Sequence, residues 1–213
     1  QATVMIAEWP RTSTNTELQQ LFSRFGNITF CDSDASSGSA RVVFDNGLSA
    51  SSAVEVMTRK ALDGLEKAWK YVERATKDGQ DREARYNMAV AAMEGAMVFQ
   101  KGLGAVHALS HPTGGLKGYR LHHGTLNAIY LPAVLRFNEP AVGDKFKRVA
   151  QVMGLPDSEA SADGVANAVS ALNERLGIPK GLGAAGLAQD TIEKIAEGAM
   201  GDHCHLSTPR QPT

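Results

Sequence analysis

The stretch Gly102-Leu-Gly-Ala-Val-His107-Ala-Leu-Ser-His111-Pro-Thr-Gly114 decides how the central part of this chain folds. His107 and His111 are four residues apart, so on a helix the two imidazoles project from one face. Pro112 and the glycines after it are expected to end that helix and to allow a close-packed turn. The stretch carries almost no charge, which is typical of a site from which water is excluded.

A third histidine follows this turn. His123 stands immediately before Gly124, at the start of an apolar run from Thr125 to Phe137 that has the character of another helix. Two imidazoles delivered from neighbouring helix ends can share one divalent ion, while a third stays available for proton transfer. Histidine pairs at this spacing also occur on helices that bind nothing, so the residues alone leave both interpretations open.

The segment from Gly102 to Pro140 resembles the signature of the iron-containing (group III) alcohol dehydrogenases. That family's pattern is G-L-G-x-x-H-x-x-x-H-P-x-G, a short turn, H-G-x-x-N-A-I-x-L-P, and a hydrophobic stretch that ends in R-F-N. The matching residues are His107-Ala-Leu-Ser-His111-Pro, His123-Gly-Thr-Leu-Asn127-Ala-Ile-Tyr-Leu-Pro132, Arg136-Phe-Asn138 and, further on, Asp202-His-Cys-His-Leu-Ser-Thr-Pro-Arg210. The resemblance extends over roughly residues 50 to 213.

The resemblance implies an all-helical, metal-binding domain of an enzyme that interconverts a small alcohol and a carbonyl compound with NAD(P). It implies that His107 and His123 are ligands of Fe²⁺ (or Zn²⁺), which would act as a Lewis acid. It places His111 close to the substrate as a catalytic proton relay. His122 matches no role in the pattern and is expected to be an outer group, and no residue is assigned to the nucleotide.

Two parts of the family's site are missing from this sequence. The family holds its ion with a further Asp and His, spaced D-x-x-x-H on an earlier helix, yet no histidine occurs before residue 100 here. The glycine-rich phosphate-binding stretch of the nucleotide domain is missing as well. Two imidazoles alone bind such ions weakly. We therefore expect these residues alone not to assemble a complete active site.

Residues 1–58 differ from the rest in sequence pattern, because strand-like and helix-like stretches alternate in them. They predict the order β-α-β-β-α of a small ferredoxin-like sandwich. Asn15 is expected to cap a helix from Thr16 to Phe25, and one face of that helix should be buried. The apolar residues of that face are Leu18, Leu21, Phe22 and Phe25. The predicted strands are Val4–Ala7, Ile28–Cys31 and Ala40–Phe44, and a second helix should open between Ser49 and Val56.

This order, with Leu18-Gln-Gln-Leu-Phe-Ser-Arg-Phe-Gly-Asn-Ile28, resembles an RNA recognition motif (RRM), most closely the divergent RRM of poly(A)-specific ribonuclease. RNA binding is not favoured, because residues 1–58 contain three arginines and six acidic residues, a net charge of −3. Only Phe30, Arg41 and Trp9 are candidates for stacking on bases. The alternative function is an RNA- or protein-binding module attached to a catalytically dead helical domain.

The whole chain is expected to be an α+β protein, with an RRM-like module at 1–58 and a helical metal-binding domain at 59–213. The helices predicted after residue 50 are Met57–Thr76, a helix capped by Asp81 that ends near Phe99, Val142–Met153, Ala162–Leu176 and Thr191–Met200. The His203-Cys-His205 cluster is interpreted as structural. The chain has 22 basic and 23 acidic residues, and this balanced charge indicates binding neither to nucleic acid nor to a membrane surface.

Two cysteines and no apolar run of membrane-spanning length predict a cytoplasmic protein. An isolated helical half of such an enzyme would expose an apolar face around its histidines. Exposed apolar faces drive association, so we expect a homo-oligomer or a covering partner segment.

Overall fold

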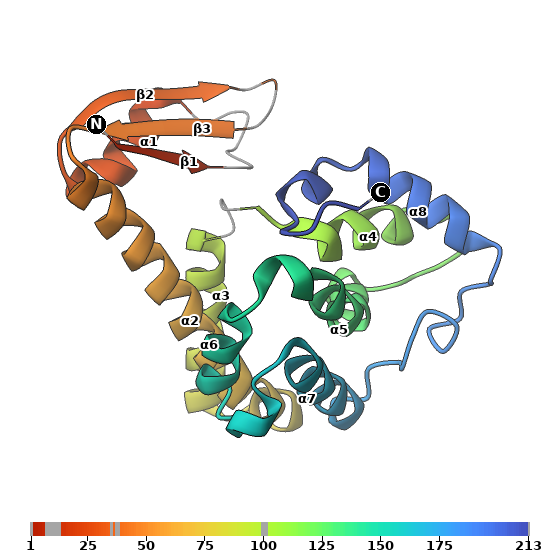
Figure 1. Ribbon diagram of the computed structural model, residues 1–213. Helices are drawn as coiled ribbons and strands as arrows, with labels where there is room; N and C mark the ends of the chain where they lie inside the picture. Colours follow the sequence, from red (N-terminus) through yellow and green to blue (C-terminus); the bar gives the residue numbers. More distant parts are fainter. Residues whose placement is uncertain (1, 7–13, 35, 37–38, 99–101, 213) are drawn as a thin grey trace. The chain divides into compact units, whose positions relative to one another are not determined.

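The structure, a computed structural model, describes residues 2–6, 14–34, 36, 39–98 and 102–212 (Figure 1). It contains a small antiparallel sheet followed by a series of helices, which confirms the α+β class. Residues group into two compact units, Gln1–Lys67 with Ala89–Gly102 and Ala68–Met88 with Leu103–Thr213. We describe each unit by itself. The predictions on Trp9 and Phe99 fall outside the described residues.

The first unit contains a three-stranded antiparallel sheet in the order β1-β3-β2. Its strands are β1 (Ala2–Ile6), β2 (Ile28–Asp34) and β3 (Ser39–Phe44). Along β3 the buried residues Ala40, Val42 and Phe44 alternate with the less buried Ser39, Arg41 and Val43, as a half-buried strand requires. The helix α1 (Asn15–Phe22), extended by a 3₁₀ turn over Ser23–Phe25, packs against β2 and β3.

One apolar cluster joins this sheet to α1 and to the start of the next helix. Its buried members are Ile6, Leu18, Phe22, Ala40, Val42, Phe44, Ala50 and Ala53. Leu18 and Phe22 on the predicted face of α1 are buried, whereas Leu21 and Phe25 are only partly buried. The predicted face of α1 does point into the apolar cluster, but Leu21 and Phe25 are not fully buried in it.

The residue that caps α1 differs from the prediction. Thr14 is the N-cap: its hydroxyl accepts from the Glu17 N–H at 3.3 Å, and the Glu17 carboxylate accepts from the Thr14 N–H at 2.7 Å. This reciprocal arrangement satisfies two backbone donors at once, which a lone Asn cap does not do. Asn15 is instead the first helical residue, and its side-chain oxygen accepts from the Ser33 hydroxyl at 2.7 Å.

The helix α2 (Gly47–Lys77) runs without interruption through the predicted boundary between residues 58 and 59. After a turn, Asp81 accepts from the Ala84 N–H at 2.9 Å, which confirms that Asp81 caps α3 (Arg82–Val98). The division of the chain at residue 58 stays a prediction.

The second unit is made of helices. They are α4 (Gly104–Gly114), α5 (His123–Val142), α6 (Lys145–Val152), α7 (Ala162–Arg175) and α8 (Thr191–Gly201), with 3₁₀ turns η3 (Asp157–Glu159) and η4 (His203–Ser207). In the described part of the chain, no helix combines the length and the apolar character needed to cross a membrane.

Helix α5 is longer than the sequence predicted, and α6 begins later. The expected end at Phe137 and the expected start at Val142 are both wrong, because α5 continues to Val142 and α6 starts at Lys145. The helix ends at Gly143, whose φ of 54° suits glycine and whose N–H donates to the Glu139 carbonyl.

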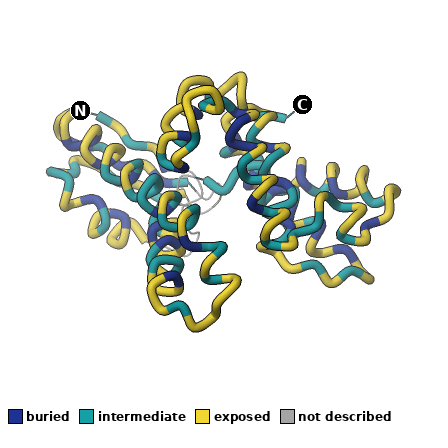
Figure 2. The backbone as a smooth tube through the Cα atoms, turned by 90° about the horizontal axis from the view of Figure 1, so that it is seen from below, coloured by how far each residue is buried: buried dark blue, intermediate teal, exposed yellow. Residues whose placement is uncertain are grey.

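The helices of the second unit enclose three small apolar clusters rather than one large core. Figure 2 shows buried and exposed residues alternating along the helices, as amphipathic segments do. Helix α4 packs against both α5 and α8. At the α4–α8 contact, a Cβ placed on Gly198 would lie 2.6 Å from the Pro112 Cβ, so the two helices approach closely because Gly198 has no side chain.

Candidate metal and catalytic site

The three histidines singled out from the sequence form one cluster. His107 and His111 lie one turn apart on α4, and His123 is the first residue of α5. The ring centroid of His123 lies 5.1 Å from that of His107 and 5.5 Å from that of His111. The rings of His111 and His123 are nearly parallel. The α4–α5 packing therefore brings together all three predicted site residues.

Asn127, one turn after His123 on α5, shows how two of these rings are directed. Its side-chain nitrogen lies 3.4 Å from the His107 Nε2 and 3.1 Å from the His123 Nε2. The two Nε2 atoms therefore converge on one point. Asn127 belongs to the matched motif but was not predicted to have a role, although its spacing of four from His123 places it on the same helix face.

Burial and charge favour a neutral imidazole at His107. Burial lowers the pKa of His107 below its usual value, and the charges that His123 and His111 carry when protonated lower it further. The His107 Nδ1 is buried, and a backbone hydrogen bond with Leu103 acts against these effects and raises the pKa of His107. A neutral imidazole is the form that binds a metal ion.

A carboxylate that the sequence analysis did not single out completes the cluster on its other side. The Asp202 Oδ2 lies 2.8 Å from the His111 Nδ1, and the Asp202 Oδ1 accepts from the Cys204 N–H at 2.8 Å. Burial alone would raise the pKa of Asp202, but the hydrogen bonds from Cys204 and His111 bring it below its usual value. Asp202 and His111 are 91 residues apart, so no local spacing could have indicated this pair.

The donor set fits part of a metal site. Two converging imidazole nitrogens suit Fe²⁺ or Zn²⁺. Where the structure describes the chain, the group of three His, Cys, Asp or Glu donors that lie within 4.8 Å of one another is His111, Asp202 and Cys204, which does not include His107 or His123. The predicted ligand pair is therefore not part of that three-donor group.

The remaining histidines lie around this cluster. His122 is the exposed N-cap of α5, and its ring lies 3.3 Å from where a Cβ on Gly124 would stand. The His203 Nε2 lies 3.9 Å from the Cys204 Sγ, while a ring nitrogen of His205 meets the Asp202 carbonyl. Both histidines also lie beside Asp202, since the His203 Nδ1 is 3.9 Å from the Asp202 Oδ1.

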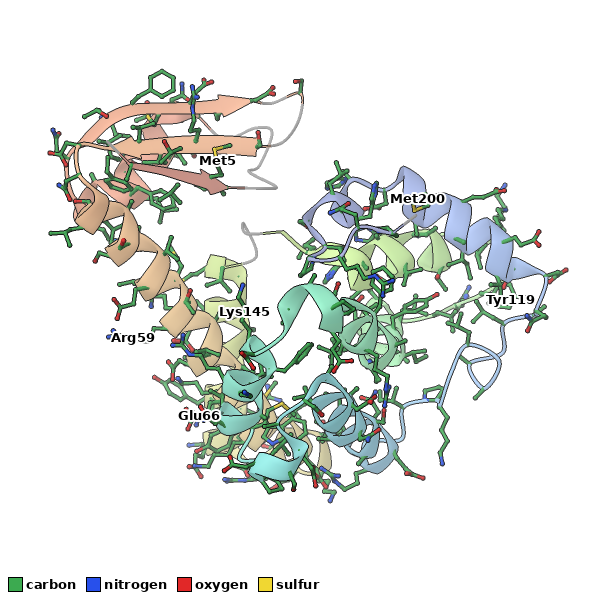
Figure 3. All side chains as sticks on the ribbon, in the orientation of Figure 1. Met5, Arg59, Glu66, Tyr119, Lys145 and Met200 are labelled. Atoms are coloured by element: carbon green, nitrogen blue, oxygen red, sulfur yellow. The ribbon has the colours of Figure 1, made fainter. Side chains whose placement is uncertain are left out.

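An apolar cavity of about 380 Å³ is lined by residues of α4, α5, α8 and η4. Its lining residues are Ala105, Ala108, Leu109, Ala133, Val134, Phe137, Ala196, Ala199, Met200, His205 and Pro212. Met200 is labelled in Figure 3 on α8. The cavity offers a substrate few polar contacts, because His205 is its one ionisable side chain.

The sheet of the first unit presents the two candidate RNA contacts on its exposed face. Phe30 is 46% exposed, and the Arg41 guanidinium lies over the Phe30 ring at 4.8 Å from its centroid. Arg41 also pairs in register with Asp32 on β2 and with Met5 on β1, which Figure 3 labels. The cation on this face is therefore already engaged by an aromatic ring and stands opposite a carboxylate.

The fold and this histidine cluster define a helical domain with a candidate metal site between α4 and α5. Residues 46–213 match the family described as Fe-containing alcohol dehydrogenase family, C-terminal, and the chain belongs to that family. Residues 4–66 match the RNA recognition motif, which confirms that resemblance. The narrower comparison with poly(A)-specific ribonuclease stays a prediction. The two matches overlap within α2.

Two curated members of this family are similar to the chain over most of its length. The chain is 53% identical over 158 residues to the 4-hydroxybutyrate dehydrogenase of Cupriavidus necator, a match that covers 71% of this chain and 40% of that one. It is 34% identical over 169 residues to the NAD-dependent methanol dehydrogenase of Bacillus methanolicus, covering 77% of this chain and 44% of that one. The chain therefore spans roughly two fifths of the length of these relatives.

A solved structure of an enzyme of similar name also matches the fold of this chain. A 1,3-propanediol oxidoreductase matches with a TM-score of 0.68 and 32% identity, over 74% of this chain and 42% of that chain. The helical fold is thus shared with an enzyme that acts on a small diol, according to that structure's name.

Proposed function

We propose that this chain is the metal-binding helical part of an NAD(P)-dependent alcohol dehydrogenase that interconverts a small alcohol and a carbonyl compound. The observation that carries the proposal is the convergence of the His107 and His123 Nε2 atoms on one point, 3.4 and 3.1 Å from the Asn127 side-chain nitrogen. The named activities of the relatives, on 4-hydroxybutyrate and methanol, support the substrate class.

In this proposal, His107 and His123 hold Fe²⁺ or Zn²⁺ through Nε2. The ion would supply Lewis-acid polarisation of the alcohol or carbonyl oxygen. His111, whose ring stacks on that of His123, takes or returns the hydroxyl proton. An ion held there would take the two Nε2 lone pairs in place of the Asn127 amide nitrogen, which lies against both atoms. NAD(P) is proposed from the NAD-dependent relative, and no residue here is assigned to it.

Metal binding by the purified chain tests the first part. Two imidazole ligands predict micromolar or weaker affinity for Fe²⁺ or Zn²⁺, measured by isothermal titration calorimetry and by elemental analysis after dialysis against a mild chelator. His107→Ala and His123→Ala should each abolish binding, whereas His122→Ala, a matched change at the neighbouring position, should not. Binding that survives both ligand variants would refute the assignment.

Activity tests the second part. Reduction of NAD⁺ or NADP⁺ is followed with short alcohols and diols in the presence of added Fe²⁺ or Zn²⁺. Turnover that His107→Ala abolishes supports the enzyme. No turnover with any metal would favour the alternative, a binding module joined to a catalytically dead helical domain.

The sheet of the first unit is proposed to contribute structure rather than RNA recognition. Its exposed Arg41 is engaged by Phe30 and faces Asp32, so it offers little charge to a phosphate. Fluorescence titration with poly(A) at moderate salt should show only weak, non-specific binding. Micromolar affinity that is lost in Phe30→Ala or Arg41→Ala would overturn this proposal.

We also propose a cytoplasmic location and a homo-oligomer. No disulfide joins Cys31 and Cys204, which is in keeping with a reducing compartment. His111 and His123 are exposed, so a second copy or another segment has access to the cluster. Analytical ultracentrifugation across a concentration series tests the oligomer, and a single monomeric species at all concentrations would exclude it.

A further inference from the structure

The contact between Asp202 and His111 has no part in the metal site proposed above. Asp202 stands at the junction between α8 and η4, and its Oδ2 lies 2.8 Å from the His111 Nδ1 on α4. At that separation the imidazole N–H donates to the carboxylate. A carboxylate on Nδ1 decides which ring nitrogen of a histidine carries the proton.

Asp202 is fixed more firmly than a surface carboxylate. Its Oδ1 accepts from the Cys204 N–H at 2.8 Å, and its own N–H donates to the Ala199 carbonyl at 3.2 Å. Its side chain is 15% exposed, against 39% for that of His111. Both oxygens therefore have a defined partner, so that the carboxylate is held in place before any substrate arrives.

The same residues are less well arranged to hold a metal ion. The Cys204 Sγ lies 4.0 Å from the His111 Nδ1, whereas the Asp202 Oδ2 lies directly against that nitrogen at hydrogen-bonding distance. The sulfur is buried in a cluster with Ala108 and Ala199, and the His203 Nε2 lies 3.9 Å from it. The geometry is that of a hydrogen-bonded pair.

We infer that Asp202 is a positioning residue that holds the proton of neutral His111 on Nδ1 and so makes Nε2 the proton-accepting nitrogen. This inference rests on the proposed role of His111 as proton relay. In the alcohol-oxidising direction, the O–H bond of the substrate breaks and an N–H bond forms at Nε2. Asp202 then stabilises the resulting imidazolium, which later gives its proton to solvent.

Nitrogen-15 spectra of the histidine side chains test this without any metal or turnover. The chain is labelled with ¹⁵N-histidine, and long-range ¹H–¹⁵N correlations are recorded at a pH where His111 is neutral. The signals of His111 are assigned by their loss in His111→Gln. The expected result is a protonated Nδ1 and an unprotonated Nε2 for His111.

Asp202→Asn changes the charge and keeps the shape. The amide oxygen can still accept from the Cys204 N–H, while the amide nitrogen donates to the His111 Nδ1 and moves the proton to Nε2. The two ring resonances of His111 should therefore exchange their character. Asp190→Asn, an exposed aspartate at the other end of α8, is the matched control and should leave the His111 signals unchanged.

A wild-type spectrum with the proton on Nε2 of His111 would overturn the inference even if the Asn variant did not fold. A His111 pattern that is the same in wild type and Asp202→Asn would overturn it as well. Failure of the proposed metal site would appear in the Fe²⁺ and Zn²⁺ titrations and not in these metal-free spectra. The two ideas can therefore fail separately.

Discussion

The sheet unit and the histidine cluster of the helical unit differ in how far their side chains are buried, since His111 and His123 are exposed. The sheet unit buries one continuous set of apolar residues, in which Phe44 and Leu18 are completely buried. The helical unit divides its apolar residues into three small clusters. Between α4 and α5 it holds imidazoles and an amide whose Oδ1 is buried without a partner. The comparison teaches that the polar cluster lowers stability in a way that the sheet unit avoids.

The largest effect is expected in the sheet unit. Phe44→Ala removes a ring that is 0% exposed and should lower the free energy of unfolding by about 3–5 kcal/mol. Denaturant unfolding measures the loss. Phe30→Ala removes a ring of the same kind that is 46% exposed, and is the control that should cost far less. Equal losses for the two rings would contradict the picture of a single packed core.

A smaller loss is expected at a buried polar pair between α4 and α5, Thr113 and Tyr130. The Thr113 hydroxyl lies 2.7 Å from the Tyr130 hydroxyl and donates to or accepts from it, and burial raises the pKa of Tyr130. Tyr130→Phe should destabilise the chain by about 1–2 kcal/mol, because it leaves Thr113 with one partner fewer. Tyr86→Phe, at a 69% exposed position, should change the unfolding midpoint very little.

Asn127→Leu tests the cost of the site directly. The substitution removes a buried amide oxygen that has no partner, so stability should rise by up to about 1 kcal/mol. Metal affinity should be retained, because an ion held by the His107 and His123 Nε2 atoms takes the lone pairs that the Asn127 amide nitrogen otherwise contacts. Calorimetric unfolding and metal titration measure the two effects. A variant that loses stability without a change in metal affinity would show that Asn127 serves packing.

The smallest effect depends on pH and concerns Glu94 on α3. Burial, the hydrogen bond with Asp63 and the charge of Asp63 raise the pKa of Glu94, and Asp63 has its own pKa lowered chiefly by its hydrogen bond with Lys67. A carboxyl whose pKa is raised on folding stabilises the protein fully below the unfolded pKa of about 4.3 and loses this contribution as pH rises through the folded value.

Glu94→Gln should therefore match the wild type in stability at acidic pH and exceed it by less than about 1 kcal/mol at neutral pH. Thermal unfolding across a pH series gives this difference. Glu66→Gln removes the same charge from an exposed position on α2, labelled in Figure 3, and is the control. A neutral-pH gain that is equal in both variants would mean that net charge, not burial, is responsible.

Local patterns predicted the parts of the molecule that depend on neighbours in sequence. The apolar face of α1, the Asp81 cap and the histidine pair on α4 are set by spacings of a few residues. Other features depended on competition between close alternatives. Thr14 rather than Asn15 caps α1 because only Thr14 stands three residues before Glu17.

Long-range pairs could not be predicted from spacing. The Asp202–His111 contact depends on how α8 packs on α4, and nothing near Asp202 in sequence records that packing. The extent of α5 was underestimated for a related reason. Its two internal prolines each remove one backbone donor, and the contacts of α5 with α4 and α7 hold the helix together across them.

The close approach of Gly198 to Pro112 has a consequence for how this gene tolerates mutation. Any side chain at position 198 must displace α8 from α4, because the nearest atoms belong to a rigid proline ring. Asp202 lies one turn further along α8 and would move with it. In a saturation library selected for dehydrogenase activity, we expect position 198 to accept fewer substitutions than the exposed His122. Intolerance at position 198 would then reflect the packing of α8 on α4, because Gly198 has no side chain that could take part in catalysis.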